Sequence, residues 1–385
     1  MTLVYLLAGE HSGDVLGARL MAALRAARPD IDFAGIGGPR MASEGLESLF
    51  PMQELAVMGL LEVLPRLARL RRLMAAAETD ILARRPQVLV TIDSPGFALR
   101  LLRRLRNSGI ARVHYVAPQV WAWRESRVRD FPGLWDRLLC LLPFEVAFFA
   151  GHGLPACFVG HPVLESGADT GDAGRFRAAQ GLAPDARVLV LMPGSRRGEA
   201  GRLLPVYGAT VARLAQRFPS LFPVVPTAAA VAGTVAAATA SWPVQPLIVT
   251  DIAAKHDAYA AAAAALTKSG TSTLELALAG VPMAVTYRVN PLTGAIARRL
   301  IRVPHVAMVN LLAGRKVVPE LLQEECQPDR LADTVATLME DGAAAAAQRA
   351  AFRNVLASLA PPHGPPSAAA AEAVLAVLDG AYRRP

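Results

Sequence analysis

The sequence predicts an α/β protein made of two Rossmann-like domains, each built on a parallel sheet. Its 385 residues exceed one small core and fit two domains of about 100–200 residues each. Short apolar runs alternate with amphipathic helical patterns, as they do when helices connect parallel strands. This alternation breaks once, over residues 161–184, which are rich in Gly, Asp, Thr and Pro. The break predicts a domain linker.

The first half repeats a strand followed by a helix. Residues 3–9 form an apolar run that predicts a buried strand, and the next helix begins near residues 12–14. Further runs predict strands at 33–36, 88–93, 113–116 and 138–142. Because helical patterns separate these strands, we expect them to be parallel.

The second half continues the same pattern. Apolar runs predict strands at 188–194, 222–225, 247–250, 263–267 and 283–287. After Pro328 only helical patterns remain, and a proline-rich break at 361–366 precedes the last helix. We therefore expect domains at residues 1–165 and 166–340, with C-terminal helices at 341–385 that pack back on the first domain.

Composition narrows the class of protein. Hydrophobic residues make up 53% and charged residues 19% of the chain, which excludes a mainly disordered protein. Cys140, Cys157 and Cys326 match neither a metal-binding CxxC pair nor a disulfide framework, so we expect a reducing compartment. The first apolar run has no basic residues before it, and the most apolar stretch, 138–150, is shorter than the roughly 20 residues of a bilayer span. We expect neither secretion nor a transmembrane helix.

Arginine carries most of the net charge of +8. Ten arginines lie between Arg66 and Arg106, against Glu78, Asp80 and Asp93. Solvated helix faces would explain this cluster, and so would an anionic membrane surface or nucleic acid. We disfavour nucleic acid, because the arginines follow amphipathic patterns and no zinc-finger or RNP-like motif is present.

The first strand ends in a polar loop. It combines Gly9 and Gly13 with Glu10, Ser12 and Asp14. Backbone N–H groups at such a helix start can hold a polar or anionic ligand. The alternative is a tight turn in which Ser12 or Asp14 caps the helix.

Two later loops of the first half carry further candidates. Asp93 ends an apolar strand before Ser94, and ligands of open α/β sheets bind beyond strand ends, so Asp93 is a candidate general base. Capping of the next helix is the alternative. Gln119 and Trp121 follow another strand, where an aromatic ring can stack on a sugar, although tryptophan also serves in packing.

Two loops of the second half indicate phosphate binding. Residues 193–199 follow a strand and enter a helix, which joins backbone amides to Ser195 and Arg196. Residues 269–273 bring four hydroxyl groups and a glycine to a helix start, and Glu275 follows, where its carboxylate suits ribose hydroxyls. Neither loop has the Walker lysine spacing, which disfavours a P-loop NTPase. Helix capping would explain one hydroxyl more easily than the whole set.

The sequence favours neither a bound metal nor another cofactor. Asp30 and Asp32 match the DxD pattern of metal-dependent sugar transferases, but they stand beside Pro29 before a short strand, as in a turn. The histidines are scattered and form no HExxH pattern, so we expect no zinc site.

Seven short motifs, taken in order, resemble those of the lipid-A-disaccharide synthase family. Each is weak alone, but the ordered set is highly specific and the likeness continues to residues 324–326. The motifs are AGEHSGD at 8–14, ELAVMG at 54–59, IDSP at 92–95, YVAPQVWAWR at 115–124, LPFE at 142–145, PGSR at 193–196 and NLLAGR at 310–315.

The resemblance implies a GT-B glycosyltransferase with two Rossmann-like domains facing a cleft. Such an enzyme joins UDP-2,3-diacylglucosamine to 2,3-diacylglucosamine 1-phosphate, inverts the anomeric carbon without a bound metal or cofactor, and releases UDP and a β-1,6-linked disaccharide. The alternative among enzymes is another two-domain UDP-sugar enzyme, such as an undecaprenyl-type N-acetylglucosaminyltransferase or a UDP-sugar 2-epimerase. A non-catalytic protein that binds nucleotide sugars or anionic lipids is the alternative from a different class.

The resemblance also assigns site residues. It implies catalytic roles for Asp93, as the base, and for Glu10, Ser12 and Arg196. It implies UDP-sugar binding by Pro193, Gly194, Ser195, Arg196, Ser269, Gly270, Thr271, Glu275 and Asn310, and acceptor or sugar binding by Gly9, Ser94, Gln119 and Trp121. The chain departs from the family at Gly96, where a second aspartate is usual, and at Arg197, where glycine is common.

The acyl chains of the implied substrates come from a bilayer. On that resemblance, an apolar segment followed by arginines becomes a peripheral membrane-docking patch made of Val57, Met58, Leu60, Leu61, Arg66 and Arg69. Packing of the apolar residues inside the first domain is the alternative. We expect a cytoplasmic protein on the inner face of the inner membrane that binds the anionic surface and both lipid substrates but no nucleic acid. A homodimer is left open.

Overall fold

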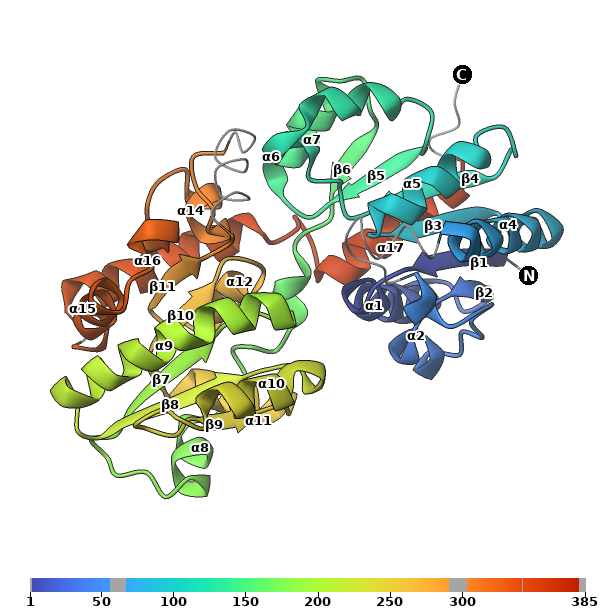
Figure 1. The fold of residues 1–385 in the computed structure, drawn as a ribbon. Coiled ribbons are helices and arrows are strands. Elements are labelled where there is room, and N and C mark those ends of the chain that lie inside the picture. The colour runs from blue at the N-terminus through green and yellow to red at the C-terminus, as the bar shows by residue number, and fades with distance from the viewer. Residues whose placement is uncertain (1, 56–66, 291–302, 341, 381–385) are drawn as a thin grey trace. The chain divides into compact units, whose positions relative to one another are not determined.

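The chain forms two compact units. The computed structural model describes residues 2–55, 67–290, 303–340 and 342–380 (Figure 1). The first unit comprises Met1–Pro162 and Leu359–Pro385, and the second comprises Val163–Ser358. Each unit contains a six-stranded sheet in which all paired strands are parallel. The two parallel sheets confirm the predicted α/β class.

The sheet of the first unit has the strand order β2-β1-β3-β4-β5-β6. Its strands are β1 Thr2–Ala8, β2 Ile31–Ile36, β3 Val88–Ile92, β4 Ala111–Tyr115, β5 Arg137–Cys140 and β6 Ala156–Phe158. Its α-helices are α1 His11–Ala27, α2 Pro39–Ser43, α4 Leu67–Arg84, α5 Pro95–Arg104, α6 Val120–Trp123, α7 Pro143–Ala150 and α17 Pro366–Leu378. Short 3₁₀ turns occur at Met52–Glu54 and Glu125–Asp130.

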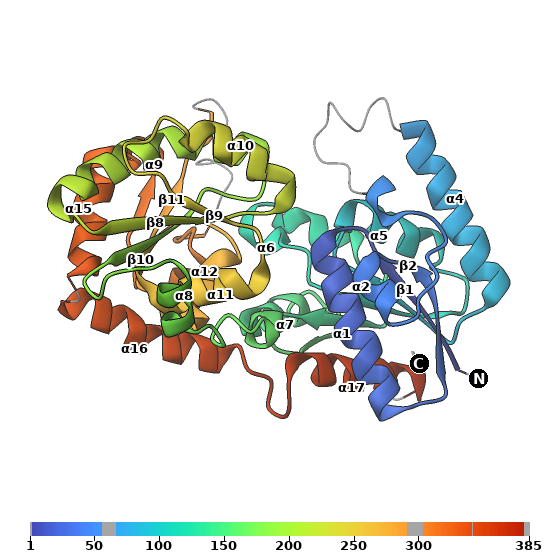
Figure 2. The same cartoon turned by 90° about the horizontal axis from the view of Figure 1, so that it is seen from below.

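Alternate residues of β1 face two separate cores. Val4 and Leu6 pack in a core with residues of α1 and α17, and these two helices contact each other (Figure 2). Tyr5 and Leu7 pack in the other core, with residues of α4 and α5. Since successive strand residues point to opposite faces, a fully apolar strand needs cover on both faces. The continuous apolar run of residues 3–7 therefore fits a central strand between two helical layers.

The sheet of the second unit has the order β12-β11-β10-β7-β8-β9. Its strands are β7 Arg187–Met192, β8 Leu221–Pro226, β9 Leu247–Val249, β10 Ala262–Lys268, β11 Met283–Tyr287 and β12 Glu320–Leu322. Its α-helices are α8 Ala173–Ala179, α9 Arg197–Arg217, α10 Ala229–Thr239, α11 Ile252–Ala261, α12 Ser272–Leu278, α14 Met308–Ala313, α15 Pro328–Met339 and α16 Ala343–Ser358. Short 3₁₀ turns lie at Pro162–Glu165, across the boundary of the units, and at Gln323–Glu325.

The second sheet is also covered on both faces. Leu189 and Leu191 pack with residues of α9, α10 and α15, whereas Val188 packs with residues of α8 and α11. Both sheets therefore show the doubly wound arrangement, in which ligands bind beyond the carboxyl ends of the strands.

Three parts of the sequence interpretation need correction. The edge strands β6 and β12, of three residues each, were not predicted. Residues 341–385 do not act as one group: α16 belongs to the second unit and contacts α12 and α14, whereas α17 packs on α1 in the first. The N-terminal segment of the first unit ends at Pro162 rather than at residue 165.

Candidate active site

Three loops of the first unit lie at one edge of its sheet. They follow β1, β3 and β4, which are neighbouring parallel strands. Asp93, Ser94 and Val116 in these loops have positive φ angles of 52°, 48° and 79°. Each such backbone costs about 1–3 kcal/mol and persists only where the surroundings hold it, as at ligand sites. The Asp93 N–H donates to the Tyr115 carbonyl at 2.9 Å, which ties the loop after β3 to β4.

Asp93 lies at the mouth of this edge. Its side chain is half-buried, and the Ser12 hydroxyl donates to Oδ2 at 3.5 Å, a long contact. Burial raises the pKa of the Asp93 carboxyl, and hydrogen bonds from the Ser94 backbone and the Ser12 side chain offset part of that rise. A carboxylate with a raised pKa is a stronger base, so Asp93 suits proton abstraction.

Gly9 and Ser94 approach each other closely. A Cβ atom on Gly9 would lie 2.3 Å from the Ser94 hydroxyl oxygen and 2.8 Å from its Cβ. Only glycine allows the loop after β1 to pass so near the loop after β3. The structure thus brings together Gly9, Ser94, Ser12 and Asp93, which the sequence placed in two separate motifs.

Neither Ser12 nor Asp14 caps α1. The N-cap residue is Glu10, which makes no side-chain capping bond there. Asp14 is fully buried, and its carboxylate accepts the backbone N–H groups of Gly38, Arg40 and Met41 at 2.8–3.0 Å. Asp14 therefore holds the loop after β2 and the start of α2, and the capping alternative is wrong for both residues.

Trp121 is held by a buried carboxylate. Its indole Nε1 donates to Glu145 Oε1 at 3.0 Å, and the Leu142 N–H donates to Oε2 at 3.1 Å. Phe144 packs edge-on against the indole. Glu145 is 3% exposed, and burial raises its pKa to about 7. We did not predict Glu145 from the sequence, although it closes the motif at 142–145.

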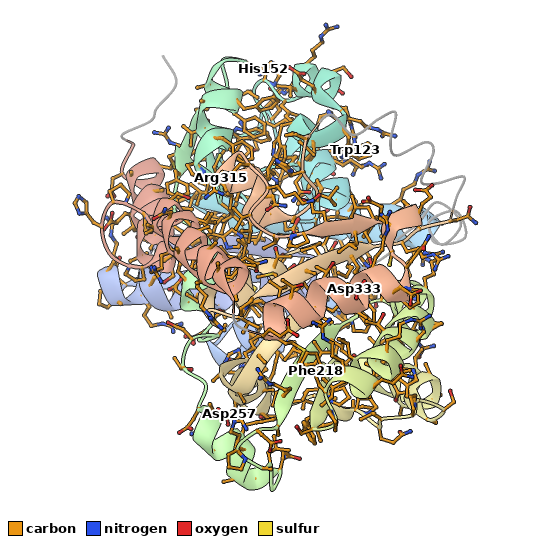
Figure 3. All side chains as sticks on the ribbon, turned by 90° about the vertical axis from the view of Figure 1, so that its left-hand side faces the viewer. Trp123, His152, Phe218, Asp257, Arg315 and Asp333 are labelled. Carbon is orange, nitrogen blue, oxygen red and sulfur yellow. The ribbon has the colours of Figure 1, made fainter. Side chains whose placement is uncertain are left out.

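The other residues of the loop after β4 are more open. Gln119 is exposed and precedes α6. Trp123, labelled in Figure 3, is 42% exposed. The guanidinium of Arg124 lies over its ring, 4.2 Å from the ring centroid. Of the two tryptophans in this motif, Trp121 is therefore the one with a fixed orientation.

The loop 193–196 of the second unit lies between β7 and α9. Gly194 has φ of 112°, and a Cβ there would lie 2.7 Å from Glu199 Oε2. Arg196 Nη1 donates to Glu199 Oε1 at 3.3 Å, and its side chain is more than half exposed. Because α9 begins at Arg197, the loop stands at the positive end of a long helix, next to an accessible guanidinium. This combination suits an anionic ligand.

The loop after β10 uses several of its hydroxyls internally. The Ser269 hydroxyl donates to the Val306 carbonyl at 2.7 Å, and the Thr273 hydroxyl donates to the Gly270 carbonyl at 2.8 Å. Thr271 is exposed and makes no side-chain capping bond to α12. Gly270 has φ of 153°. Thr271 and the glycine backbone are thus the more accessible groups of this loop.

Glu275 is paired with a lysine. Lys255 Nζ donates to Glu275 Oε2 at 3.0 Å, and the Tyr259 hydroxyl donates to the same oxygen at 3.4 Å. A quarter of the Glu275 side chain is exposed. Neither of these two bonds uses the other carboxylate oxygen, Oε1.

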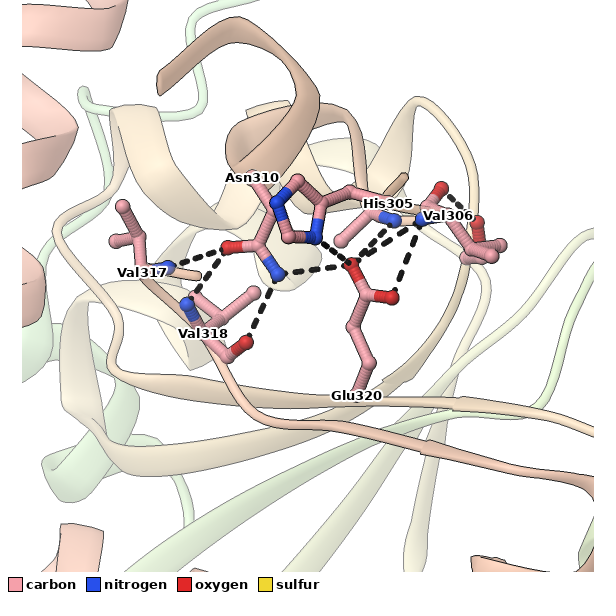
Figure 4. A network of polar contacts seen from close by, with 8 residues as sticks. His305, Val306, Asn310, Val317, Val318 and Glu320 are labelled. Atoms are coloured by element: carbon pink, nitrogen blue, oxygen red, sulfur yellow. Dashed lines mark hydrogen bonds and ion pairs between the residues drawn. The ribbon is translucent and has the colours of Figure 1, made fainter. Parts of the chain in front are cut away.

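Asn310 was predicted to contact the UDP-sugar, but its side chain lies inside the protein. It is fully buried, and its Oδ1 accepts the N–H groups of Val317 and Val318 at 2.7 and 2.8 Å (Figure 4). Its Nδ2 donates to the Val318 carbonyl at 2.9 Å and to Glu320 Oε1 at 2.8 Å. These four bonds use the hydrogen-bonding capacity of the amide. We therefore correct Asn310 from a ligand contact to a residue that positions the segment before β12.

Most of the predicted docking patch falls outside the described residues. This applies to Val57, Met58, Leu60, Leu61 and Arg66. Arg69, at the start of α4, is exposed and donates to both carboxylate oxygens of Glu54, at 3.0 and 2.7 Å. Among the residues that the structure describes, no helix is both long and apolar enough to cross a membrane.

Two solved structures with a similar fold are an epimerase and a glycosyltransferase by their names. A putative UDP-N-acetylglucosamine 2-epimerase of Listeria monocytogenes aligns with a TM-score of 0.65 at 13% identity, covering 99% of this chain and 96% of that one. A calicheamicin glycosyltransferase aligns with a TM-score of 0.59 at 17% identity, covering 99% of both chains. At such low identity these likenesses show the fold alone, and the fold is GT-B.

Sequence comparison separates the two classes. The model of the family described as lipid-A-disaccharide synthetase matches residues 4–374. The lipid-A-disaccharide synthase of Granulibacter bethesdensis is 63% identical, covering 98% of both chains, and that of Gluconobacter oxydans is 60% identical, covering 98% of this chain and 91% of the other. A Pseudomonas aeruginosa synthase is 45% identical, covering 98% of both chains. The chain therefore belongs to the lipid-A-disaccharide synthase family of hexosyltransferases.

Proposed function

We propose that this protein transfers a 2,3-diacylglucosamine unit from UDP to the 6-hydroxyl of 2,3-diacylglucosamine 1-phosphate, through the residues described above. Membership of the family is the observation that supports this reaction. The position of Asp93, half-buried at a strand end with a raised pKa, supports the assignment of the base.

In the proposed reaction Asp93 accepts the proton of the acceptor 6-hydroxyl. The oxygen then attacks the anomeric carbon from the side opposite to the diphosphate, a new carbon–oxygen bond forms, and the bond to the diphosphate oxygen breaks. This single displacement inverts the anomeric carbon and gives a β-1,6 linkage. Ser12 orients the Asp93 carboxylate, because it already contacts Oδ2.

The departing UDP gains negative charge, which needs nearby positive groups. We assign this role to Arg196 and to the backbone N–H groups of Gly194 and Ser195, at the start of α9. Pro193, Ser269, Gly270, Thr271 and Glu275 complete the proposed UDP-sugar contacts. Gly9, Glu10, Ser94, Gln119 and Trp121 are proposed to contact the acceptor or the sugar, with Trp121 stacking on a ring.

We further propose peripheral association with the cytoplasmic face of the inner membrane, through the patch at residues 57–69. The substrates carry acyl chains, so the enzyme must meet them at a bilayer. Apolar side chains for shallow insertion and arginines for anionic headgroups support this proposal. The homodimer stays a prediction.

The proposed reaction is tested by supplying the donor with and without the acceptor. We expect UDP release only with both substrates, in equal amount to a disaccharide 1-phosphate identified by its mass. UDP release that does not depend on the acceptor, or no disaccharide, would contradict the proposal. Epimerisation of the donor at C2 would favour the epimerase alternative, and tight binding of both ligands without turnover would favour a binding protein.

A further inference from the structure

One carboxylate oxygen in the second unit holds two cations. Glu199 Oε1 accepts a hydrogen bond from Lys268 Nζ at 2.9 Å and from Arg196 Nη1 at 3.3 Å. Lys268 ends β10, and Glu199 lies in the first turn of α9. Since β10 pairs directly with β7, Lys268 comes to the same strand-end edge as the loop 193–196. Neither Lys268 nor Glu199 was among the predicted site residues.

The position of Glu199 is tightly constrained. Its Oε2 lies 2.7 Å from where a Cβ on Gly194 would be, so the carboxylate packs against the loop. Among the described residues this oxygen is buried and accepts no hydrogen bond. The side chains of Glu199 and Lys268 are only 18% and 20% exposed. A partly buried carboxylate oxygen without a hydrogen bond lowers the stability of the folded state. Packing of the core does not require such a group.

Arg196 and Lys268 lie so close together that their positive charges need a nearby anion. Arg196 and Lys268 both lie within hydrogen-bond reach of one oxygen, so without Glu199 their charges would repel each other. A diphosphate can supply the same negative charge, because it offers several oxygens to guanidinium and ammonium groups. Lys268 has three N–H donors and gives only one of them to Glu199.

We infer that Lys268 is a further ligand of the donor diphosphate, and that Glu199 is an internal counter-ion that holds Arg196 and Lys268 until the donor binds. When the donor binds, the diphosphate replaces Glu199 as the partner of both cations. This inference rests on the proposed UDP-sugar site. It differs from a merely structural ion pair, in which both residues would stabilise the second unit and leave ligand affinity unchanged.

The inference predicts opposite effects for the two partners. Lys268→Met removes a cation and should weaken UDP binding about tenfold, whereas Glu199→Gln keeps the size and the Lys268 bond, removes the competing anion and should tighten UDP binding about tenfold. Uridine, which lacks the diphosphate, should bind all variants equally. In a Lys268→Met background the effect of Glu199→Gln should shrink, because one of the two cations is gone.

A matched pair of controls lies at the other end of α9. Arg217 ends that helix and pairs with Glu340 on the surface at 2.5 Å. Arg217→Met and Glu340→Gln change the same charges away from the site and should leave UDP affinity unchanged. Melting temperatures of all variants show whether a loss of binding follows from a loss of folding.

Isothermal titration with UDP and uridine decides the matter. UDP affinity within about twofold of wild type in both Lys268→Met and Glu199→Gln, or weaker binding in both, would overturn the inference. Wild-type protein that does not bind UDP would overturn the proposed function instead. Wild-type binding that is lost on Arg196→Ala, with Lys268→Met unaffected, would keep the proposed function and reject the role of Lys268.

Discussion

Asp93 has the position and the ionisation of a general base. It follows the end of β3, in a loop where Asp93 and Ser94 both have positive φ angles. Its half-buried environment raises its pKa, which strengthens a base as long as the group stays ionised at the working pH. Asp30 is an exposed carboxylate of the same unit, and the Thr2 hydroxyl donates to its Oδ2 at 3.3 Å. It provides a matched comparison.

The raised pKa of Asp93 predicts an acid limb in the pH profile. Protonated Asp93 cannot accept the acceptor proton, so kcat/KM should fall as the pH falls through its raised pKa. The limb should lie above the ordinary aspartate value of about 3.9. The profile of Asp30→Asn should match wild type. An unchanged rate down to the ordinary aspartate range would contradict the assignment.

The pair Glu145 and Trp121 predicts a second titration. Burial raises the Glu145 pKa from 4.5 to about 7, so ionisation of this group costs folding free energy. The protein should lose stability as the pH rises from the unfolded value through about 7, by an amount on the order of 3 kcal/mol. Glu145→Gln should remove this dependence. Tryptophan fluorescence should change with the same midpoint in wild type but not in Trp121→Phe, and a flat response in wild type would contradict the pairing.

Individual site residues differ in how well the sequence predicts them. Asp93, Ser12 and Arg196 are candidates from the sequence, since polar residues directly after apolar strands mark the ligand edge, and their roles stay predictions. Glu145 and Lys268 were missed, because their importance lies in contacts with residues far along the chain. Asn310 was misassigned, because a motif does not show whether its amide faces a ligand or the protein.

At the scale of elements, loops that follow neighbouring parallel strands form each candidate site. The long central strands were predicted from continuous apolar runs, as both faces of each are covered by helices. The short edge strands β6 and β12 left no such pattern. Local sequence also could not place α16 and α17 in different units, because both are alanine-rich helices whose partners are distant in sequence.

The approach of the loops after β1 and β3 predicts a specific rescue. Gly9→Ala would place a Cβ 2.3 Å from the Ser94 hydroxyl oxygen and 2.8 Å from its Cβ, so the loops must separate. We expect a loss of about 1–3 kcal/mol in stability. Ser94→Gly removes both clashing atoms and suits the positive φ at that position, so the double variant should regain most of the lost stability. Equal melting temperatures for Gly9→Ala and the double variant would contradict this packing.

At the scale of the whole molecule, the membrane patch predicts a difference between two forms of substrate. Replacing Met58, Leu60 and Leu61 by serine should reduce liposome binding and lower activity more on bilayer-held substrate than on detergent-dispersed substrate. Binding should also fall with salt, because headgroup attraction of roughly 1 kcal/mol per arginine is screened within about 10 Å at 0.1 M.

Controls for the membrane patch lie elsewhere in the first unit. Leu49 and Leu82 are exposed apolar residues, 39% and 44% accessible, and their serine variants should bind liposomes as wild type does. A triple variant that melts early, or that is equally impaired on both forms of substrate, would show that the three residues pack inside the protein instead.

The two units have separate cores and separate strand-end loops, and we assign half of the reaction to each. On this proposal, the first unit would supply the base and the acceptor contacts. The second would supply the groups that bind UDP and stabilise its departure. A change in one set of loops should therefore affect one half of the reaction.

Turnover and UDP affinity, measured together for Asp93→Asn and Arg196→Ala, test this division most directly. Asp93→Asn should lower turnover by ~100-fold or more while UDP affinity and the fold are kept. Arg196→Ala should weaken UDP binding about tenfold, because a charge-assisted contact is lost. Near-wild-type turnover in Asp93→Asn, or unchanged UDP affinity and turnover in Arg196→Ala, would contradict the account.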